Sequence, residues 1–327
     1  IDPALARVRR TLPDKAYSVA DVAGHLTEQW AKKLGLPAGI PVAVGAFDAH
    51  LGAVGSGIAP GVMVKILGTS TCDMGQALPD IPGLCGIVPE SILPGYYGLE
   101  AGQSAVGDIF NWFVNYIEPG GTRRGRHETL TKDARKLRPG ESGLLGLDWH
   151  NGNRTVLVDQ RLTGLLLGMT LHTTPAEIYR ALIESTAFGA RVIMERFEEY
   201  GVRAKRVVNC GGIATKNPLV MQILADVMNR PMEVSRSAQT CALGAAMAGA
   251  VAAGKQAGGH ANFEDAAAKM TGVQRHVYKP TLDSVAVYDR LYRMYRRLHD
   301  AFGTREYKDG LFEVMKELLD IRDKVRG

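Results

Sequence analysis

A short segment after an apolar run has the residue types needed to hold a phosphate group. The run Val62–Leu67 is followed by Gly-Thr-Ser-Thr at 68–71 and then by Cys72. Glycine lets backbone N–H groups approach a ligand closely, and neighbouring hydroxyls can donate hydrogen bonds to phosphate oxygens. A plain β-turn, or a nucleophile at Ser70 or Cys72, are the alternatives. The nucleophile is disfavoured because no G-x-S-x-G elbow surrounds these residues. Cys72 fits a buried small hydrophobe better.

A second glycine pair stands where a predicted strand leads into a helix. Gly211 and Gly212 follow the β-branched run 206–209, and Asn217 before Pro218 is typical of a helix start. The N-terminus of a helix presents unpaired amides and a partial positive charge, which suits an anion. Neither G-x-G-x-x-G nor the Walker sequence occurs here, so the pair alone does not identify a ligand.

One carboxylate stands at the end of another apolar run. Asp48 follows the run 41–47, which predicts a buried strand, and precedes a small-residue helix containing His50. Pairing with His50, a metal site and a helix N-cap are the possible roles for Asp48, and the local pattern slightly favours the N-cap. Residues two apart on a helix do not face each other, so an Asp48–His50 pair is disfavoured and His50 is expected to be structural.

The elements that must position these side chains alternate between strands and helices. Apolar periodicity predicts helices over 175–200, 219–228 and 240–253, and two late helices, while 118–143 predicts a loop or a mobile helical insertion. The run Val62–Leu67 is expected to fold back as a hairpin. The pattern therefore predicts an α/β fold with a mixed sheet flanked by helices.

Composition excludes several classes of protein. The 327 residues carry 46% hydrophobic and 22% charged side chains and a net charge of +5, without a concentrated basic patch, which argues against nucleic acid as a partner. Four cysteines lack metal-binding or C-x-x-C spacing, and no run is long enough to span a membrane. We therefore expect a cytoplasmic protein with reduced thiols; self-association is left open.

Six ordered motifs together resemble the FGGY family of carbohydrate kinases. They are GAFDAHLGAVGSG (45–57), VKILGTSTCD (64–73), GLEAGQSAVGDIFNWF (98–113), LDWHNGNRT (147–155), ESTAFGARVIME (184–195) and GGIATKNPLVMQILADVMNRP (211–231). The resemblance implies the actin-like, ribonuclease-H-like ATPase fold, with ATP and Mg²⁺ as cofactors and a sugar as the second substrate. The motifs are most similar to those of members that phosphorylate L-ribulose, as in arabinose catabolism.

The resemblance also implies roles for individual residues. Asp48 takes the position of the catalytic base and also contacts the sugar. Glu100 takes the position of a second sugar contact. The nucleotide-binding positions are Gly68, Thr69, Ser70, Gly107, Asn111, Gly211, Gly212, Lys216 and Asn217. It assigns no metal ligand in this chain, because the family's magnesium motif lies in an N-terminal domain.

The matched motifs predict a division of the chain at residue 57. Residues 1–57 are expected to be the end of the family's N-terminal domain, and 58–327 its C-terminal, nucleotide-binding domain. Because most of the N-terminal domain has no counterpart here, we expect little kinase activity from this chain alone. The alternatives are another FGGY specificity, such as xylulose or glycerol, and a non-catalytic nucleotide-binding module.

Overall fold

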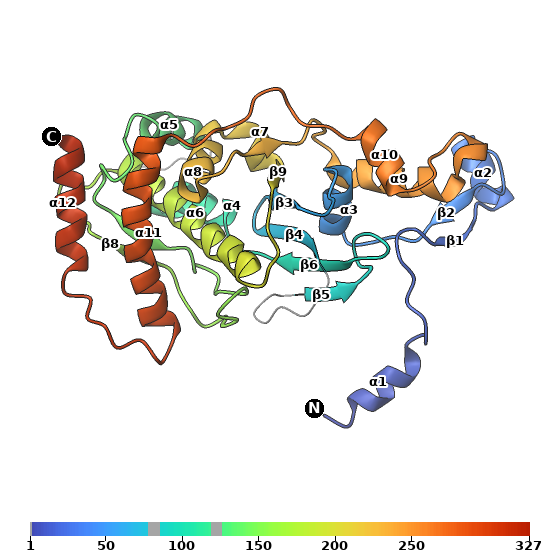
Figure 1. The fold of residues 1–327 in the computed structure, drawn as a ribbon, viewed down its shortest axis with the longest axis horizontal. Coiled ribbons are helices and arrows are strands. Elements are labelled where there is room, and N and C mark those ends of the chain that lie inside the picture. Colours follow the sequence, from blue (N-terminus) through green and yellow to red (C-terminus); the bar gives the residue numbers. More distant parts are fainter. Residues whose placement is uncertain (1, 78–85, 119–125) are drawn as a thin grey trace.

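A mixed six-stranded sheet forms the centre of the molecule (Figure 1). The computed structural model describes residues 2–77, 86–118 and 126–327. In spatial order the strands are β10 (Glu233–Val234), β9 (Arg206–Cys210), β3 (Val62–Leu67), β4 (Thr71–Ala77), β6 (Tyr97–Ala101) and β5 (Gly86–Pro89). β9 is parallel to β3 and β10, whereas β4 is antiparallel to both β3 and β6. The predicted mixed sheet and hairpin are therefore confirmed.

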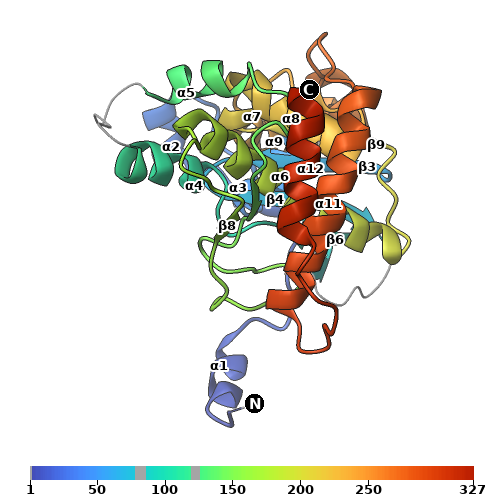
Figure 2. The same cartoon turned by 90° about the vertical axis from the view of Figure 1, so that its left-hand side faces the viewer.

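One face of the sheet is covered by a helical layer around the larger core. Its longest helix, α6 (Pro175–Glu199), begins with a capping box between Thr174 and Glu177 and ends before Gly201, whose φ is 84°. This confirms the helix predicted over 175–200. The same layer contains α4 (Gly107–Trp112), the π-helix η1 (Phe113–Ile117), α5 (Arg126–Ala134), β7 (Leu145–Leu147), β8 (Leu165–Leu167), α8 (Pro218–Met228), α11 (Leu282–Gly303) and α12 (Val314–Arg326). Figure 2 shows α11 and α12 side by side at its outer end.

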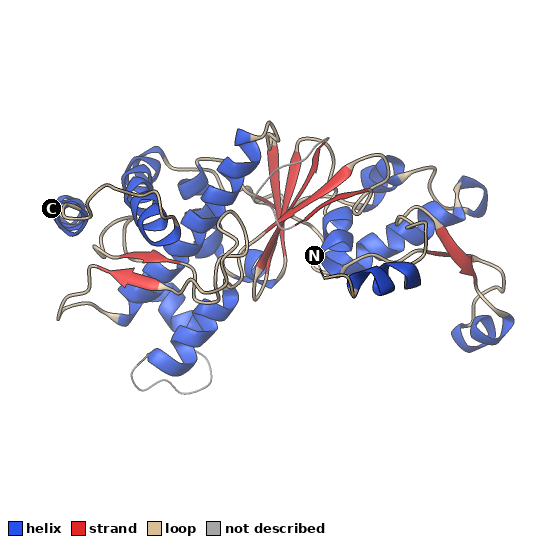
Figure 3. Cartoon of the chain, turned by 90° about the horizontal axis from the view of Figure 1, so that it is seen from below, coloured by secondary structure: helices blue, strands red, loops and turns tan. Residues whose placement is uncertain are grey.

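The other face is covered by two helices in close contact, α3 (Asp48–Gly55) and α9 (Thr240–Ala253). A Cβ on Gly55 would lie 2.0 Å from the Thr240 carbonyl oxygen, and one on Gly244 would lie 2.0 Å from the Leu51 carbonyl oxygen. The close packing of α3 against α9 therefore depends on these glycines. Beyond it lie α2 (Glu28–Leu34), β1 (Val22–His25), β2 (Pro41–Ala43), η2 (Lys255–Ala257) and α10 (Phe263–Met270). Figure 3 shows the central sheet between the two groups of helices.

Two expectations about elements change. The run 41–47 is not a buried strand: only Pro41–Ala43 is extended, half-exposed, and paired with β1 in a separate two-stranded sheet. Within 118–143, residues 126–134 form α5, which packs on α6 through buried Leu130, so the helical alternative applies there. Residues 119–125 and Cys85 lie outside the described residues.

A second apolar core joins segments that are far apart in sequence. Val19, Val54 and Ile58 pack with Met247 and Phe263, so that α9 and α10 share a core with the first 58 residues. The division at residue 57 remains a prediction, which these contacts do not test. None of the helices in the described ranges has the length and apolar character needed to cross a membrane.

Candidate active site

The tip of the β3–β4 hairpin is held against the start of α4. The Gly68 N–H donates to the Ser70 carbonyl at 3.0 Å, which closes the turn. The N–H of Val106 donates to the Thr69 carbonyl at 2.8 Å, and that of Gly107 to the Gly68 carbonyl at 3.1 Å. A Cβ on Gly107 would lie 2.6 Å from the Gly68 carbonyl oxygen, so glycine is needed for this approach. Backbone amides at the start of α4 thus fix the hairpin and leave Thr69 exposed at its tip.

The Gly211 bend lies against the end of β3. Gly211 has a φ of 92°, and a Cβ there would lie 2.4 Å from the Leu67 carbonyl oxygen. Because β9 and β3 are parallel, their C-terminal ends meet at one edge of the sheet, where α/β sheets commonly bind ligands. Ile213, in the short helix α7 (Gly212–Lys216), comes within 3.2 Å of where a Gly107 Cβ would be. The hairpin, the start of α4 and the 211 bend therefore converge.

Three other residues expected to bind the nucleotide are Lys216, Asn217 and Asn111. Lys216 is exposed to solvent, whereas the side chains of Asn217 and Asn111 have hydrogen-bond partners within the protein. Lys216 is exposed at the end of α7. The Asn217 side chain accepts a hydrogen bond from the Val220 N–H at 3.2 Å and so caps α8, as its sequence position predicts. Asn111, on α4, lies 2.8 Å from His127 Nε2 on α5. The sequence analysis did not anticipate that histidine partner.

Asp48 is the first residue of α3. It is exposed, and its Oδ1 accepts a hydrogen bond from the Ala49 N–H at 2.7 Å. The N-cap position itself belongs to Phe47, which makes no side-chain cap. α3 packs against β3 and β4, the two strands of the hairpin.

Glu100 lies on β6 in a cluster of polar side chains. Its Oε2 is 3.6 Å from His50 Nε2, and its Oε1 accepts from the Cys72 thiol at 3.6 Å. The hydrogen bond from His50 lowers the pKa of the Glu100 carboxyl, as does the nearby charge of Arg154, against the opposing effect of burial. His50 is buried, as expected for a structural residue, and Cys72 is half-buried against the second apolar core. Each side chain also contacts the Glu100 carboxylate, and no local sequence pattern predicts these contacts.

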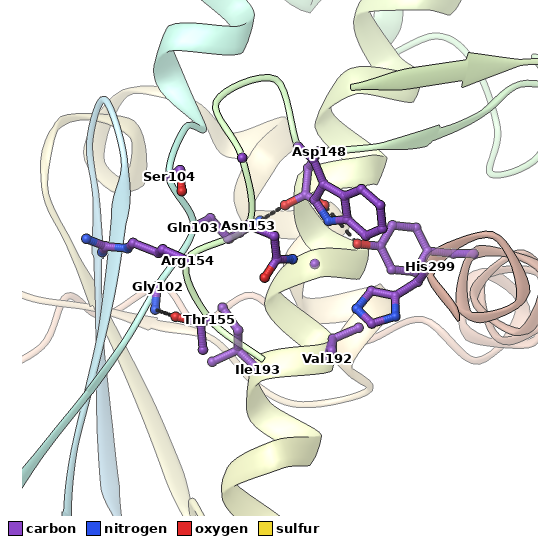
Figure 4. Close-up of a pocket in the computed structure, with 14 residues that line it drawn as sticks. Gly102, Gln103, Ser104, Asp148, Asn153, Arg154, Thr155, Val192, Ile193 and His299 are labelled. Atoms are coloured by element: carbon purple, nitrogen blue, oxygen red, sulfur yellow. Dashed lines mark hydrogen bonds between the residues drawn. The ribbon is translucent and has the colours of Figure 1, made fainter. Parts of the chain in front are cut away.

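A buried polar chain runs from the hairpin base into the helical layer, and Figure 4 shows its part around Gln103 and Asp148. The Thr71 hydroxyl donates to Gln103 Oε1 at 3.2 Å, and Gln103 Nε2 donates to Asp148 Oδ2 at 2.6 Å. The hydroxyl of Tyr295, on α11, donates to Asp148 Oδ1 at 2.8 Å. Burial raises the pKa of the Asp148 carboxyl to about 6, although these hydrogen bonds act in the opposite direction.

The sequence analysis missed Gln103, Asp148 and Arg154 as parts of the site. Gln103 belongs to the motif GLEAGQS, and the other two lie in LDWHNGNRT, to which no chemistry was assigned. Their presence in quoted motifs was the available signal. Their partners are 32 to 147 residues away in sequence, so no local pattern identifies them.

Comparison with known proteins defines the class. Residues 63–253 match the C-terminal domain of the FGGY family of carbohydrate kinases. This match covers more than half of the chain, and the chain therefore belongs to the FGGY family of carbohydrate kinases.

Within the described residues, no three His, Cys, Asp or Glu side chains come together in a way that could hold a metal ion.

Two relatives with high sequence identity to this chain are ribulokinases. The ribulokinase of Anoxybacillus flavithermus is 47% identical over an alignment covering 100% of this chain and 59% of that protein. The ribulokinase of Halalkalibacterium halodurans is 48% identical over 98% of this chain and 58% of that protein. The chain thus spans less than two thirds of the length of these relatives.

Solved structures agree on the fold. The xylulose kinase of Rhodospirillum rubrum has a TM-score of 0.76 and 26% identity over 92% of this chain and 60% of that one. A xylulose kinase of Lactobacillus acidophilus has a TM-score of 0.78 at 21% identity, covering 94% of this chain and 61% of that one. The expected sugar-kinase fold is confirmed.

Proposed function

We propose that the protein transfers the γ-phosphoryl group of ATP to a hydroxyl of L-ribulose, giving L-ribulose 5-phosphate. The observation that carries the proposal is the convergence of the 68–70 hairpin tip and the Gly211 bend at one sheet edge, next to the strand that bears Glu100. Membership of the FGGY family supports sugar phosphorylation. The 47–48% identity to ribulokinases favours L-ribulose over xylulose or glycerol.

The proposed base is Asp48. Its carboxylate is exposed at the first turn of α3, and its Oδ1 accepts a hydrogen bond from the Ala49 amide. A carboxylate in this position can accept the proton of an attacking hydroxyl.

The proposed sugar contact is Glu100. Since its pKa is lowered, the side chain stays ionised at neutral pH and acts only as a hydrogen-bond acceptor. His50 and Cys72 occupy one position on each carboxylate oxygen, and the remaining lone pairs can accept from sugar hydroxyls.

The proposed phosphate contacts are the backbone N–H groups and hydroxyls of Thr69 and Ser70, while Gly68, whose N–H closes the turn, and Gly107 hold the hairpin tip in place. The open space over Gly212 leaves room for a bound nucleotide beside the Gly211 bend. We place Gly211, Gly212, Lys216 and Asn217 on the adenosine side, and Asn111 nearby. Mg²⁺ would supply charge neutralisation on the phosphates; we assign it no ligand here.

We also propose that the protein works in the cytoplasm and acts on small molecules rather than on nucleic acid. Phosphoryl transfer depends on positioning from both sides of a closing cleft, and the chain spans under two thirds of the ribulokinases' length. We therefore expect little turnover by the 327 residues alone.

A coupled assay for ADP release tests the proposal. The chain is assayed alone and in fusion behind the N-terminal segment of the Halalkalibacterium halodurans ribulokinase, with MgATP and L-ribulose, xylulose or glycerol. We expect turnover only by the fusion, with the highest kcat/KM for L-ribulose. Preference for another sugar would change the assigned substrate. No turnover with any sugar, from a fusion that binds MgADP, would favour a non-catalytic nucleotide-binding module.

A further inference from the structure

One loop residue, Arg154, lies between the proposed phosphate-binding hairpin and the proposed sugar-binding carboxylate. Arg154 lies between β7 and β8, and its Nη2 donates to the Thr71 carbonyl at 2.6 Å and to Cys72 Sγ at 3.2 Å. Thr71 begins the strand that leaves the phosphate hairpin, and the Cys72 thiol donates to Glu100. We propose that Arg154 is a positioning residue that fixes the sugar-binding carboxylate relative to the phosphate-binding hairpin. This inference rests on the proposed function.

The next residue in the loop, Thr155, is hydrogen-bonded to the backbone directly after β6. The Thr155 hydroxyl oxygen accepts a hydrogen bond from the Gly102 N–H at 2.9 Å, two residues after Glu100. Arg154 and Thr155 therefore hold the start of β4 and the residue that follows β6 from a single short segment. A shift of this segment would move both strands at the point where they carry the proposed site.

The space for the guanidinium depends on a glycine. A Cβ on Gly102 would lie 2.0 Å from the Thr71 carbonyl oxygen and 2.3 Å from Arg154 Nη2. No side chain at residue 102 can coexist with this arrangement. Figure 4 shows Arg154 and Gly102 beside each other at the edge of the buried polar chain.

The loop that delivers Arg154 is held in an unfavourable backbone conformation. Val156 and Val158 have φ angles of 80° and 54°, which β-branched residues rarely adopt. Such positions are strained and persist only where surrounding contacts enforce them. Reciprocal 2.9 Å hydrogen bonds join Asn153 and Asp159, and Leu157 packs against the end of α11 at Gly303. The fold thus holds this loop firmly in place.

The charge of Arg154 suits the same role. Its guanidinium and His50 both lower the pKa of Glu100, so the carboxylate they help to orient also stays ionised. Because displacement of a reacting group by about 1 Å can lower a rate about a hundredfold, a residue that sets the spacing of two subsites should affect kcat.

Arg154→Lys tests the proposal, with Arg161→Lys as matched control. Lysine keeps the charge, but its side chain is one bond shorter and lacks the rigid guanidinium plane, so Nζ cannot take the position of Nη2 beside Thr71 and Cys72. Arg161 is in the same loop, and its side chain is 91% exposed and paired with Asp159. Hydrogen exchange is followed at the amides of 68–72 and 102 in the 327-residue chain, and kcat and KM for L-ribulose are measured in the fusion.

We expect Arg154→Lys to speed exchange in these segments at least tenfold and to lower kcat at least tenfold, while distant helices exchange as before. Arg161→Lys should change neither. Thr155→Val, which removes the hydroxyl that accepts from the Gly102 N–H, should give smaller changes in the same direction and serves if Arg154→Lys fails to fold. Exchange and kcat unchanged from the parent would overturn the positioning role. If the parent fusion shows no turnover, the proposed function fails, and hydrogen exchange alone still tests whether Arg154 holds the two segments.

Discussion

At the scale of single residues, Asp48 allows chemistry to be separated from folding. Its carboxylate is exposed and accepts a hydrogen bond from the Ala49 amide, which the carbonyl oxygen of an asparagine can also accept. Asp48→Asn should therefore lower the kcat of the fusion by about 10²–10⁴, the usual contribution of a general base, and leave the melting temperature unchanged. Asp283→Asn, at an exposed aspartate in the first turn of α11, is the control. Undiminished kcat would remove Asp48 from the mechanism.

Asp148 should give a pH-dependent stability. Burial raises its pKa from 3.8 to about 6, so the folded state binds this proton more tightly than the unfolded chain. The stabilisation is therefore present below about pH 4 and is lost as the pH rises through about 6. The free energy of unfolding of the parent minus that of Asp148→Asn should fall by about 2–3 kcal/mol between pH 4 and pH 7, measured in urea.

An exposed carboxylate provides the opposite sign. Hydrogen bonds from the Arg161 backbone and side chain lower the pKa of Asp159, so its stabilisation is present above its unfolded pKa and lost in acid. The free energy of unfolding of the parent minus that of Asp159→Asn should therefore rise as the pH rises.

For Asp148→Asn, a difference in the free energy of unfolding that does not change with pH would mean that the Asp148 carboxyl titrates alike in the folded and unfolded chain.

At the scale of elements, a buried ion pair sets the register of the hairpin. Lys65 on β3 and Asp73 on β4 face each other across the antiparallel pair, and both are fully buried. Apolar neighbours on Val62–Leu67 would permit other registers, whereas a slipped register would leave each charge unpaired inside the protein. The pair therefore holds the 68–70 tip at the start of α4.

Asp73→Asn should lower the free energy of unfolding by about 3–5 kcal/mol in urea denaturation, because it leaves the Lys65 ammonium buried without a counter-charge. Lys65→Met combined with Asp73→Leu should recover most of that loss. Asp133→Asn, which breaks an exposed pair with Lys136, should leave the stability nearly unchanged. A loss no larger for Asp73→Asn than for Asp133→Asn would exclude the register role.

At the scale of the whole molecule, the two ends of the chain contribute unequally. α1 (Leu5–Thr11) buries no residue and projects from the body (Figures 1 and 2), whereas α12 buries Val314, Leu318 and Ile321. Deletion of residues 2–11 should change the free energy of unfolding by less than about 0.5 kcal/mol. Deletion of 314–327 should remove several kcal/mol, since about 1.5–3 kcal/mol accompanies each buried aliphatic side chain. Equal effects of the two deletions in urea denaturation would contradict this difference.

The sequence alone determined the elements with strong local patterns and, through the family motifs, the class of protein. Helix α6, the β3–β4 hairpin and the Asn217 cap follow from periodicity and turn chemistry, which act within a few residues. Only the tertiary structure decided that Pro41–Ala43 stands in a separate sheet, that His50 and Cys72 orient Glu100, and that Arg154 meets Thr71. These contacts join residues 28 to 83 positions apart, or depend on which strands pair, and chain packing rather than local preference brings them together.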